Sequence, residues 1–197
     1  MDLLDPREQV PWITFGAQAW LEGYLQPDMA VFEWGSGGST LYFARRVRRV
    51  VSVEHNPDWH RDVQAALASS GVANCEYLLR VPRRCRFARY LPYNGCTYVS
   101  RTFAEHRDLT FRAYARQIAA CPDRSFDLVV VDGRVRAACL RLAWRKIKPG
   151  GFLLLDNAER PSYQPAMARL ARFARQDFCG RGPRLVEEWQ TTVWQIR

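Results

Sequence analysis

Short apolar runs alternate with amphipathic segments along most of the chain, and this alternation predicts the fold class. The runs are nearly uninterrupted, as in strands that are covered on both faces. Between them, apolar side chains recur every three or four residues, which is typical of one buried helix face. Strands are expected at residues 29–34, 48–54, 75–79, 126–131 and 152–155, and helices at residues 11–25, 38–46, 57–70, 109–120, 135–147 and 163–176. The pattern predicts an α/β fold, a doubly wound sandwich with a mostly parallel sheet.

The C-terminal part departs from this alternation. Residues 185–189 and 191–196 are two adjacent strand-like segments, which predict an antiparallel hairpin with Gln190 near its turn. A length of 197 residues suits one domain with a sizeable core, so we expect residues 1–197 to form a single unit. Its first 27 residues are expected to be an N-terminal capping region. Residues 81–108 form a connection of unusual length, which predicts a loop that covers the substrate.

The cysteines and the lengths of the apolar runs indicate the cellular compartment in which the protein is expected. The six cysteines are scattered without a C-x-x-C pair, which favours reduced, mostly buried thiols and argues against a zinc site. The first residues contain no basic segment followed by an apolar one, and no apolar run is long enough to span a bilayer. We therefore expect a soluble, cytoplasmic protein without a membrane partner.

The net charge of +9 is carried almost entirely by arginine, because Lys146 and Lys148 are the only lysines. Arginine binds phosphate and carboxylate groups through a planar fork, so the excess is consistent with an anionic ligand or a nucleic acid. A compositional bias of the source genome would produce the same excess. Both explanations remain open from the sequence.

The strongest candidate for chemistry is the glycine-rich stretch that follows the strand at 29–34. Gly35, Gly37 and Gly38 allow the backbone to approach a ligand closely, and the helix that follows directs unpaired N–H groups toward it. Glu54 ends the next strand, where an acid would meet ribose hydroxyls. Thr40 stands where a dinucleotide fingerprint requires a third glycine, so an NAD-dependent oxidoreductase is disfavoured.

Four features in this order carry a resemblance to a known family. They are the turn from Glu33 to Gly38, the acid Glu54, the strand from Phe126 to Asp132, and Lys148-Pro149-Gly150-Gly151. Together they resemble the class I S-adenosylmethionine-dependent methyltransferases over about residues 29–157. The resemblance implies a Rossmann-like methyltransferase fold with S-adenosylmethionine as cofactor, and methyl transfer to an oxygen or nitrogen nucleophile. Among such proteins, the chain is similar to small members without an assigned substrate.

The resemblance also implies roles for individual residues. Glu54, with His55 beside it, would accept hydrogen bonds from the ribose hydroxyls, and Glu33 would face the methionine amino group. Asp132 would meet the cofactor or the substrate. The segment after the third strand offers no acid for the adenine amino group, so that contact stays unassigned. The residues implied in cofactor binding are Glu33, Gly35, Ser36, Gly37, Gly38, Ser39, Glu54, His55 and Asp132.

Three polar side chains that end two later strands are the catalytic candidates: Asp132, Asp156 and Asn157. They should project into one crevice, because the carboxyl ends of parallel strands meet at the same edge of a sheet. This set resembles the metal site of catechol-type O-methyltransferases, and its oxygen ligands would suit Mg²⁺ or Ca²⁺. However, the positions after Asp132 lack the lysine that those enzymes place there, and each residue could simply cap a turn. No metal is therefore included in the predicted site.

The acceptor is expected to be a small molecule, and an anionic group on it could be bound by Arg134 or Arg136. The loop at 81–108 adds His106 as a candidate general base. Its mixture of arginines and aromatic residues also suits single-stranded RNA, so an RNA-binding or RNA-modifying protein is the alternative. The loop residues behind this interpretation are Tyr90, Tyr93, Asn94, Gly95 and Tyr98.

Overall fold

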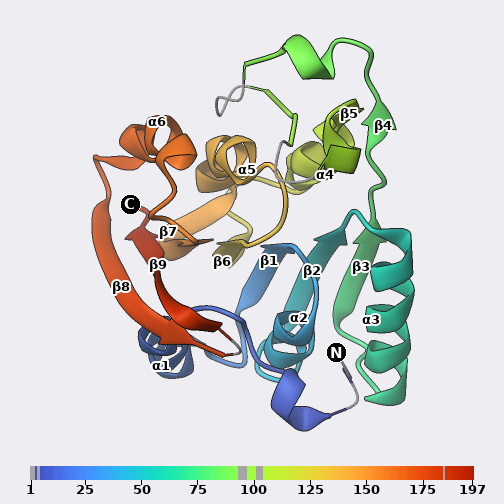
Figure 1. The fold of residues 1–197 in the computed structure, drawn as a ribbon. Helices are drawn as coiled ribbons and strands as arrows, with labels where there is room; N and C mark the ends of the chain where they lie inside the picture. Colours follow the sequence, from blue (N-terminus) through green and yellow to red (C-terminus); the bar gives the residue numbers. More distant parts are fainter. Residues whose placement is uncertain (1–2, 4, 93–96, 101–103, 184) are drawn as a thin grey trace.

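Seven strands form one sheet in the order β3-β2-β1-β6-β7-β9-β8 (Figure 1). The computed structural model describes residues 3, 5–92, 97–100, 104–183 and 185–197. Among these residues, neighbouring strands of the sheet are parallel, except that β9 pairs antiparallel with both β7 and β8. The order reverses between β1 and β6, which creates a crevice at the carboxyl ends of these two strands. The strands are β1 (Ala30–Trp34), β2 (Arg49–Glu54), β3 (Cys75–Leu79), β6 (Phe126–Val131), β7 (Ile147–Asp156), β8 (Ala174–Gly182) and β9 (Leu185–Gln195).

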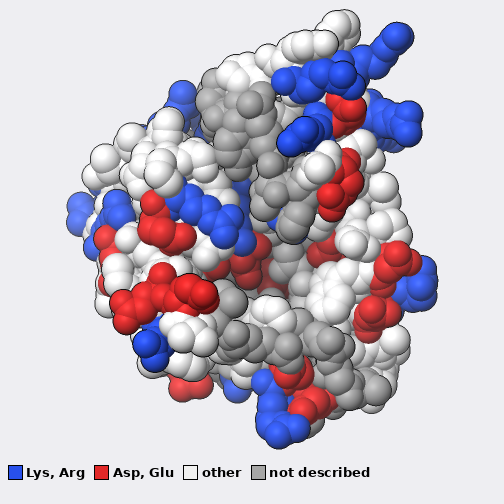
Figure 2. All heavy atoms as spheres, in the orientation of Figure 1, with Lys and Arg blue, Asp and Glu red and all other residues white. Residues whose placement is uncertain are grey.

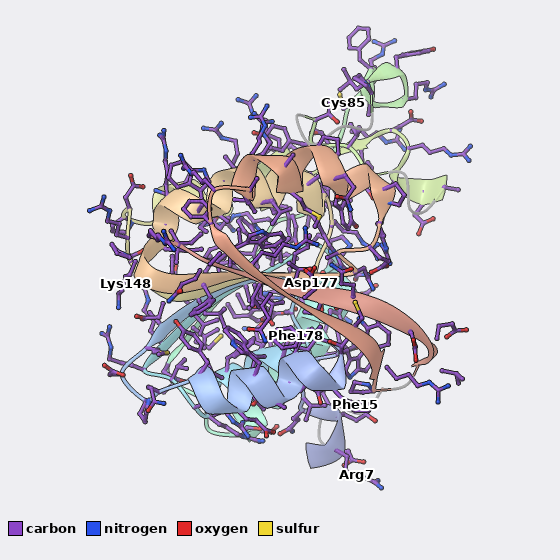
Figure 3. All side chains as sticks on the ribbon, turned by 90° about the vertical axis from the view of Figure 1, so that its left-hand side faces the viewer. Arg7, Phe15, Cys85, Lys148, Asp177 and Phe178 are labelled. Carbon is purple, nitrogen blue, oxygen red and sulfur yellow. The ribbon has the colours of Figure 1, made fainter. Side chains whose placement is uncertain are left out.

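Helices cover both faces of the sheet, as the uninterrupted apolar runs predict. Successive strand residues point to opposite faces, so Val31 packs with α1 and α2, whereas Phe32 packs with α4, α5 and α6. Figure 3 shows α1 against the sheet, near Phe178 of β8. The helices are α1 (Phe15–Tyr24), α2 (Gly38–Ala44), α3 (Pro57–Ser69), α4 (Arg112–Arg116), α5 (Arg136–Ala143) and α6 (Gln164–Met167). The α/β Rossmann-like fold with C-terminal antiparallel strands is thus confirmed.

The local signals for α3 have direct counterparts in the structure. The Asn56 side chain accepts hydrogen bonds from the backbone N–H groups of Asp58 and Trp59 at 2.9 and 3.1 Å, and Pro57 occupies the first turn. This cap begins the helix two residues after Glu54, so the end of β2 is tied to the start of α3. The position of the acid is therefore well determined by local structure.

The predicted C-terminal hairpin has the wrong boundaries. Residues 185–195 form one continuous strand, β9, and Gln190 pairs with Cys179 in the middle of it. The partner strand is β8, where we expected the end of a helix at 163–176. The helical residues end near Leu170, after the short helix η7 (Ala168–Leu170). The sequence signal for β8 is weak because most of its side chains are exposed, so no apolar run or alternation marks it.

The long connection after β3 carries a small ribbon of its own. β4 (Arg83–Arg84) pairs antiparallel with β5 (Leu109–Thr110), and the 3₁₀ turns η2 (Ala88–Tyr90) and η3 (Ala104–His106) lie between them. We call residues 81–92 and 104–110 the arm; in Figures 1 and 3 the arm stands away from the sheet, with Cys85 far from Phe15. Tyr93, Asn94 and Gly95, which we expected in a substrate loop, lie outside the described residues.

Two further predictions need adjustment. The segment 109–120 is not one helix, since it contains β5, the single turn α4 and the 3₁₀ helix η4 (Gln117–Ala120). β7 begins at Ile147 rather than at 152, and the expected stop at Lys148–Gly151 is an irregularity within it, with Gly150 at a φ of 86°. None of the helices in the described ranges is both long and apolar enough to cross a membrane.

Candidate active site

Two adjoining cavities open at the carboxyl ends of β1, β2 and β6. The first, of about 430 Å³, is lined by residues that follow these strands and by the arm. The second, of about 230 Å³, lies along the glycine turn and is closed by the N-terminal segment with Val10 and Trp12. Gly35, Trp59 and Asp132 line both cavities. The molecule is hollowed on this side, and acidic side chains lie within the hollow (Figure 2).

The glycine turn is held closely against the end of β6. Gly35 has a φ of 92°, and a Cβ atom there would lie 2.7 Å from the Cα atom of Gly133. On the other side of the turn, a Cβ atom on Gly38 would overlap the Glu8 carbonyl oxygen. The glycines therefore allow two backbone segments to pack on the turn, in addition to any ligand. Gly35, Ser36, Gly37, Gly38 and Ser39 all line the second cavity, and their contact with a cofactor stays a prediction.

Glu33 lies behind this turn and is completely buried. Its carboxylate accepts hydrogen bonds from the hydroxyls of Ser39, Thr40 and Ser52, at 2.6 Å for Thr40 and 2.7 Å for Ser52. Burial raises the pKa of Glu33 to about 7, although these hydroxyls favour the charged form. Glu33 thus ties the first turn of α2 to β1 and β2, and its expected contact with the methionine amino group stays a prediction.

Glu54 faces the larger cavity at the end of β2. Its Oε1 accepts hydrogen bonds from the backbone N–H groups of His55 and Asn56 at 2.7 and 2.8 Å, and His55 Nδ1 also lies 2.7 Å away. Its Oε2 accepts from the N–H and hydroxyl of Ser36 at 3.3 and 3.1 Å. Burial opposes the charged form of Glu54, but the contact with His55 and the backbone N–H groups outweighs it and lowers the pKa.

Asp132 lies where the two cavities meet, and an arginine holds it there. Arg136 Nη2 is 2.9 Å from Asp132 Oδ1, and Arg136 Nη1 donates to the Asp156 carbonyl oxygen at 2.6 Å. Burial opposes the charge of Arg136, but Asp132 and Asp156 outweigh it, so the pKa of Arg136 is raised. The turn that presents these residues is strained, because the β-branched Val135 has a φ of 48°.

A family model described as a methyltransferase domain matches residues 32–158, which include the glycine turn, Glu54 and Asp132. The match covers more than half of the chain. The chain belongs to this methyltransferase family. No protein with a curated description matches the sequence.

Solved methyltransferase structures share the fold of this family member at low sequence identity. A putative O-methyltransferase from Klebsiella pneumoniae has 17% identity and a TM-score of 0.60, over 86% of this chain and 73% of that chain. A putative methyltransferase from Streptococcus mutans in complex with SAH has 8% identity and a TM-score of 0.58, over 90% and 94%. An rRNA methylase from Streptococcus thermophilus has 9% identity and a TM-score of 0.60, over 92% and 95%.

The three catalytic candidates of this methyltransferase are only partly brought together. Asp132 lines the cavities, but Asp156 is buried and accepts hydrogen bonds from Trp189 Nε1 at 2.8 Å and the Thr191 hydroxyl at 2.9 Å. Asn157 is in the left-handed region with a φ of 51°, and its Oδ1 accepts from Arg160 at 2.7 Å. The sequence could not indicate Trp189 and Thr191 as partners, because they lie on strand β9, far from Asp156 along the chain, whereas Arg160 belongs to the loop that directly follows Asn157.

This donor set does not fit a divalent cation. Oδ1 of Asp156 is occupied by Trp189 and Thr191, and the side of the acid pair that faces the cavity is filled by the Arg136 guanidinium. A Mg²⁺ or Ca²⁺ ion needs several free oxygen ligands around one point. We therefore assign no step to a metal in this methyltransferase.

The arm contributes His106 and Glu105 to the larger cavity. The ring centroids of His106 and His55 are 5.9 Å apart, and both rings contact Phe111. Burial, Arg134 and His55 all lower the pKa of His106, so the neutral imidazole is favoured. Arg134 lines the same cavity, and its contact with an anionic acceptor stays a prediction.

Several site residues were missed by the sequence analysis. Trp59 donates from Nε1 to the Ser36 carbonyl at 2.8 Å, and the Tyr77 hydroxyl lies 2.6 Å from the Ser36 hydroxyl. Trp12 lies in the expected N-terminal capping region and lines the smaller cavity together with Val10. Among these residues, only Trp59 could have been predicted from the sequence, because it lies in the first turn of the helix that follows Glu54. Val10, Trp12 and Tyr77 carry no local signal, since their place depends on long-range packing.

Proposed function

We propose that this protein transfers the methyl group of S-adenosylmethionine to an oxygen or nitrogen nucleophile of a small molecule. The observation that carries the proposal is Glu54, a buried carboxylate with a lowered pKa that faces the cavity beside the glycine turn. A charged carboxylate at this place is a suitable hydrogen-bond acceptor for two ribose hydroxyls. The smaller cavity along Gly35 to Ser39 suits the methionine part of the cofactor. The Streptococcus mutans neighbour, which was solved with SAH, supports the same choice of cofactor.

Ser36 explains how Glu54 would become available to the ribose. The Ser36 hydroxyl lies within hydrogen-bond distance of both Glu54 Oε2, at 3.1 Å, and the Tyr77 hydroxyl, at 2.6 Å. When Ser36 donates to Tyr77 instead, Oε2 keeps the hydrogen bond from the Ser36 N–H at 3.3 Å and can also accept from a ribose hydroxyl.

The acceptor would reach the cofactor cavity from the side of the arm. A cavity of about 610 Å³ lies there, lined by Arg84, Arg86 and Tyr90 among others, and Glu105 lines both this cavity and the cofactor cavity. The arginines favour an acceptor with a carboxylate or phosphate group, and the volume suits a small molecule. His106, neutral and close to the same opening, is the candidate that would take the proton from the nucleophile.

Isothermal titration calorimetry with S-adenosylhomocysteine tests the cofactor. Glu54→Ala should abolish measurable binding, and Glu54→Gln should weaken it roughly 100-fold, because charge-assisted hydrogen bonds contribute about 1.5–3 kcal/mol. Glu76→Ala removes an exposed acid on the adjacent strand and serves as the matched control. Heat on titration with NAD, with none on titration with S-adenosylhomocysteine, would instead support the oxidoreductase.

A second candidate function, methylation of RNA, is favoured by one observation on the arm. Phe87 and Tyr90 expose 72% and 76% of their surface, beside Arg83, Arg84 and Arg86. Exposed aromatic rings next to arginines suit the stacking of unpaired bases. The rRNA methylase among the structural neighbours is consistent with this alternative. A release assay for S-adenosylhomocysteine decides between the two acceptor classes when it is run once with small anionic molecules and once with single-stranded RNA.

A further inference from the structure

One arginine, Arg136, is surrounded by oxygen atoms from three residues. Arg136 Nη2 lies 2.9 Å from Asp132 Oδ1, and Nη1 lies 2.6 Å from the Asp156 carbonyl oxygen and 3.4 Å from Asp156 Oδ2. Nε donates to the Gly133 carbonyl oxygen at 3.0 Å. The Arg136 side chain is 11% exposed, and those of Asp132 and Asp156 are 26% and 5% exposed. Two carboxylates and two carbonyls thus face a single, mostly buried cation.

The chemistry of this cluster depends on that cation. Two carboxylates at the ends of neighbouring strands repel each other in a site with little water, unless a positive charge lies between them. The planar guanidinium satisfies both of them and two carbonyls with three nitrogen atoms, which a lysine ammonium could not do in the same geometry. All four oxygens are of the kind that a hard divalent cation would otherwise bind.

We propose that the guanidinium of Arg136 is the resident cation of this site, in the place between Asp132 and Asp156 that a divalent metal ion would take. Arg136 is then a positioning residue: it holds the Asp132 carboxylate at the junction of the two cavities. Removal of the guanidinium exposes a latent metal site built from Asp132, Asp156 and the two carbonyls. The proposal does not depend on the identity of the methyl acceptor.

Mn²⁺ binding to the purified full chain tests this directly, by calorimetry and by the loss of the free Mn²⁺ signal in electron paramagnetic resonance. The wild type should bind no Mn²⁺ at millimolar concentration, and Arg136→Ala should bind one ion with a Kd on the order of 10⁻⁴ M. Arg134→Ala is the matched control, because it removes an arginine from the same turn and cavity but leaves the acid pair bridged. Arg136→Ala combined with Asp132→Asn should lose the ion again.

Mn²⁺ should also raise the melting temperature of Arg136→Ala by several degrees and leave that of the wild type unchanged, since only the variant has ligands to offer. Arg136→Ser, which also removes the guanidinium and is too short to bridge Asp132 and Asp156, serves if the alanine variant does not fold. Binding of Mn²⁺ by the wild type that is lost in Asp132→Asn would overturn the proposal. So would a folded Arg136 variant that binds no Mn²⁺. Neither result bears on the cofactor, whose binding is measured separately with S-adenosylhomocysteine.

Discussion

At the scale of single residues, the most unusual group is Glu33, a carboxylate without contact to solvent. Three hydroxyl groups direct their protons to it, and burial still raises its pKa to about 7. A buried acid of this kind binds a proton in the folded state at pH values where the unfolded chain has released it. Its contribution to stability therefore depends on pH in the neutral range.

Glu33→Gln should change the pH dependence of stability. In the wild type, the raised pKa makes a contribution that is present below about pH 4.5 and is lost as the pH rises toward 7. The Glu33→Gln variant has no carboxyl group to ionise at this position, so its stability does not change in this way. The difference in free energy of unfolding, variant minus wild type, should therefore increase by about 3 kcal/mol between pH 4.5 and 7.5. Urea unfolding at a series of pH values measures this. Glu22→Gln, on the exposed side of α1, is the control, and parallel curves for Glu33→Gln and the wild type would contradict the assignment.

At the scale of elements, the site depends on how closely the ends of β1 and β6 approach. Gly35 directly follows β1 and Gly133 lies just after β6, and each would clash with its surroundings if it carried a side chain. This contact places the glycine turn and Asp132 at the same cavity. The crevice between these two strands is thus a packed junction rather than an open gap, and its geometry is sensitive to single methyl groups.

Gly133→Ala should therefore destabilise the protein by about 2 kcal/mol, because the new methyl group would overlap the hydroxyl of the buried Tyr114. Gly23→Ala provides the control: this glycine lies in α1 with nothing within 4 Å of its Cβ position, so the change should stabilise by about 0.5–1 kcal/mol. Urea unfolding of both variants tests the pair. Equal effects of the two substitutions would show that the junction is not tightly packed.

At the scale of the whole molecule, the net charge of +9 is spread over many arginines, and several of them gather on the arm (Figure 2). The arm also carries the exposed rings of Phe87 and Tyr90. If binding follows net charge alone, arginines anywhere on the surface should contribute equally to the affinity for a polyanion. If the arm is a specific nucleic-acid site, the arginines of the arm should contribute most of this affinity.

If the arm binds RNA, replacing Arg83, Arg84 and Arg86 by alanine should flatten the salt dependence. The slope of log K against log salt for a fluorescent single-stranded 12-mer should change by about 2, because each phosphate contact on a single strand contributes about 0.7. The control removes the same charge at the opposite end of the sheet, at Arg124, Arg145 and Arg197. Equal changes in both triple variants would mean that the attraction follows net charge only.

Much of the candidate site could be predicted because its signals are local. Residues Gly35 to Ser39 were predicted to bind the cofactor together with Glu54, His55 and Asp132, and the structure places all of them in the walls of the two cavities. Asp156 and Asn157 were expected beside them but bond to Trp189, Thr191 and Arg160 instead. Their backbone positions follow from the strands that they end. The direction of each side chain depends on its hydrogen-bond partners, and those of Asp156 lie on β9, more than 30 residues away along the chain.

By itself, the sequence determined where the buried strands lie along the chain, the position of the glycine turn, and Glu54 at the end of the second strand. The signals for these features are local: apolar runs, a left-handed backbone position and a helix cap. Only the tertiary structure decided that β8 is a strand, since its exposed edge carries no apolar pattern. It also decided that Arg136 bridges Asp132 and Asp156, because an ion pair between separate strand ends forms only after the sheet has brought them together.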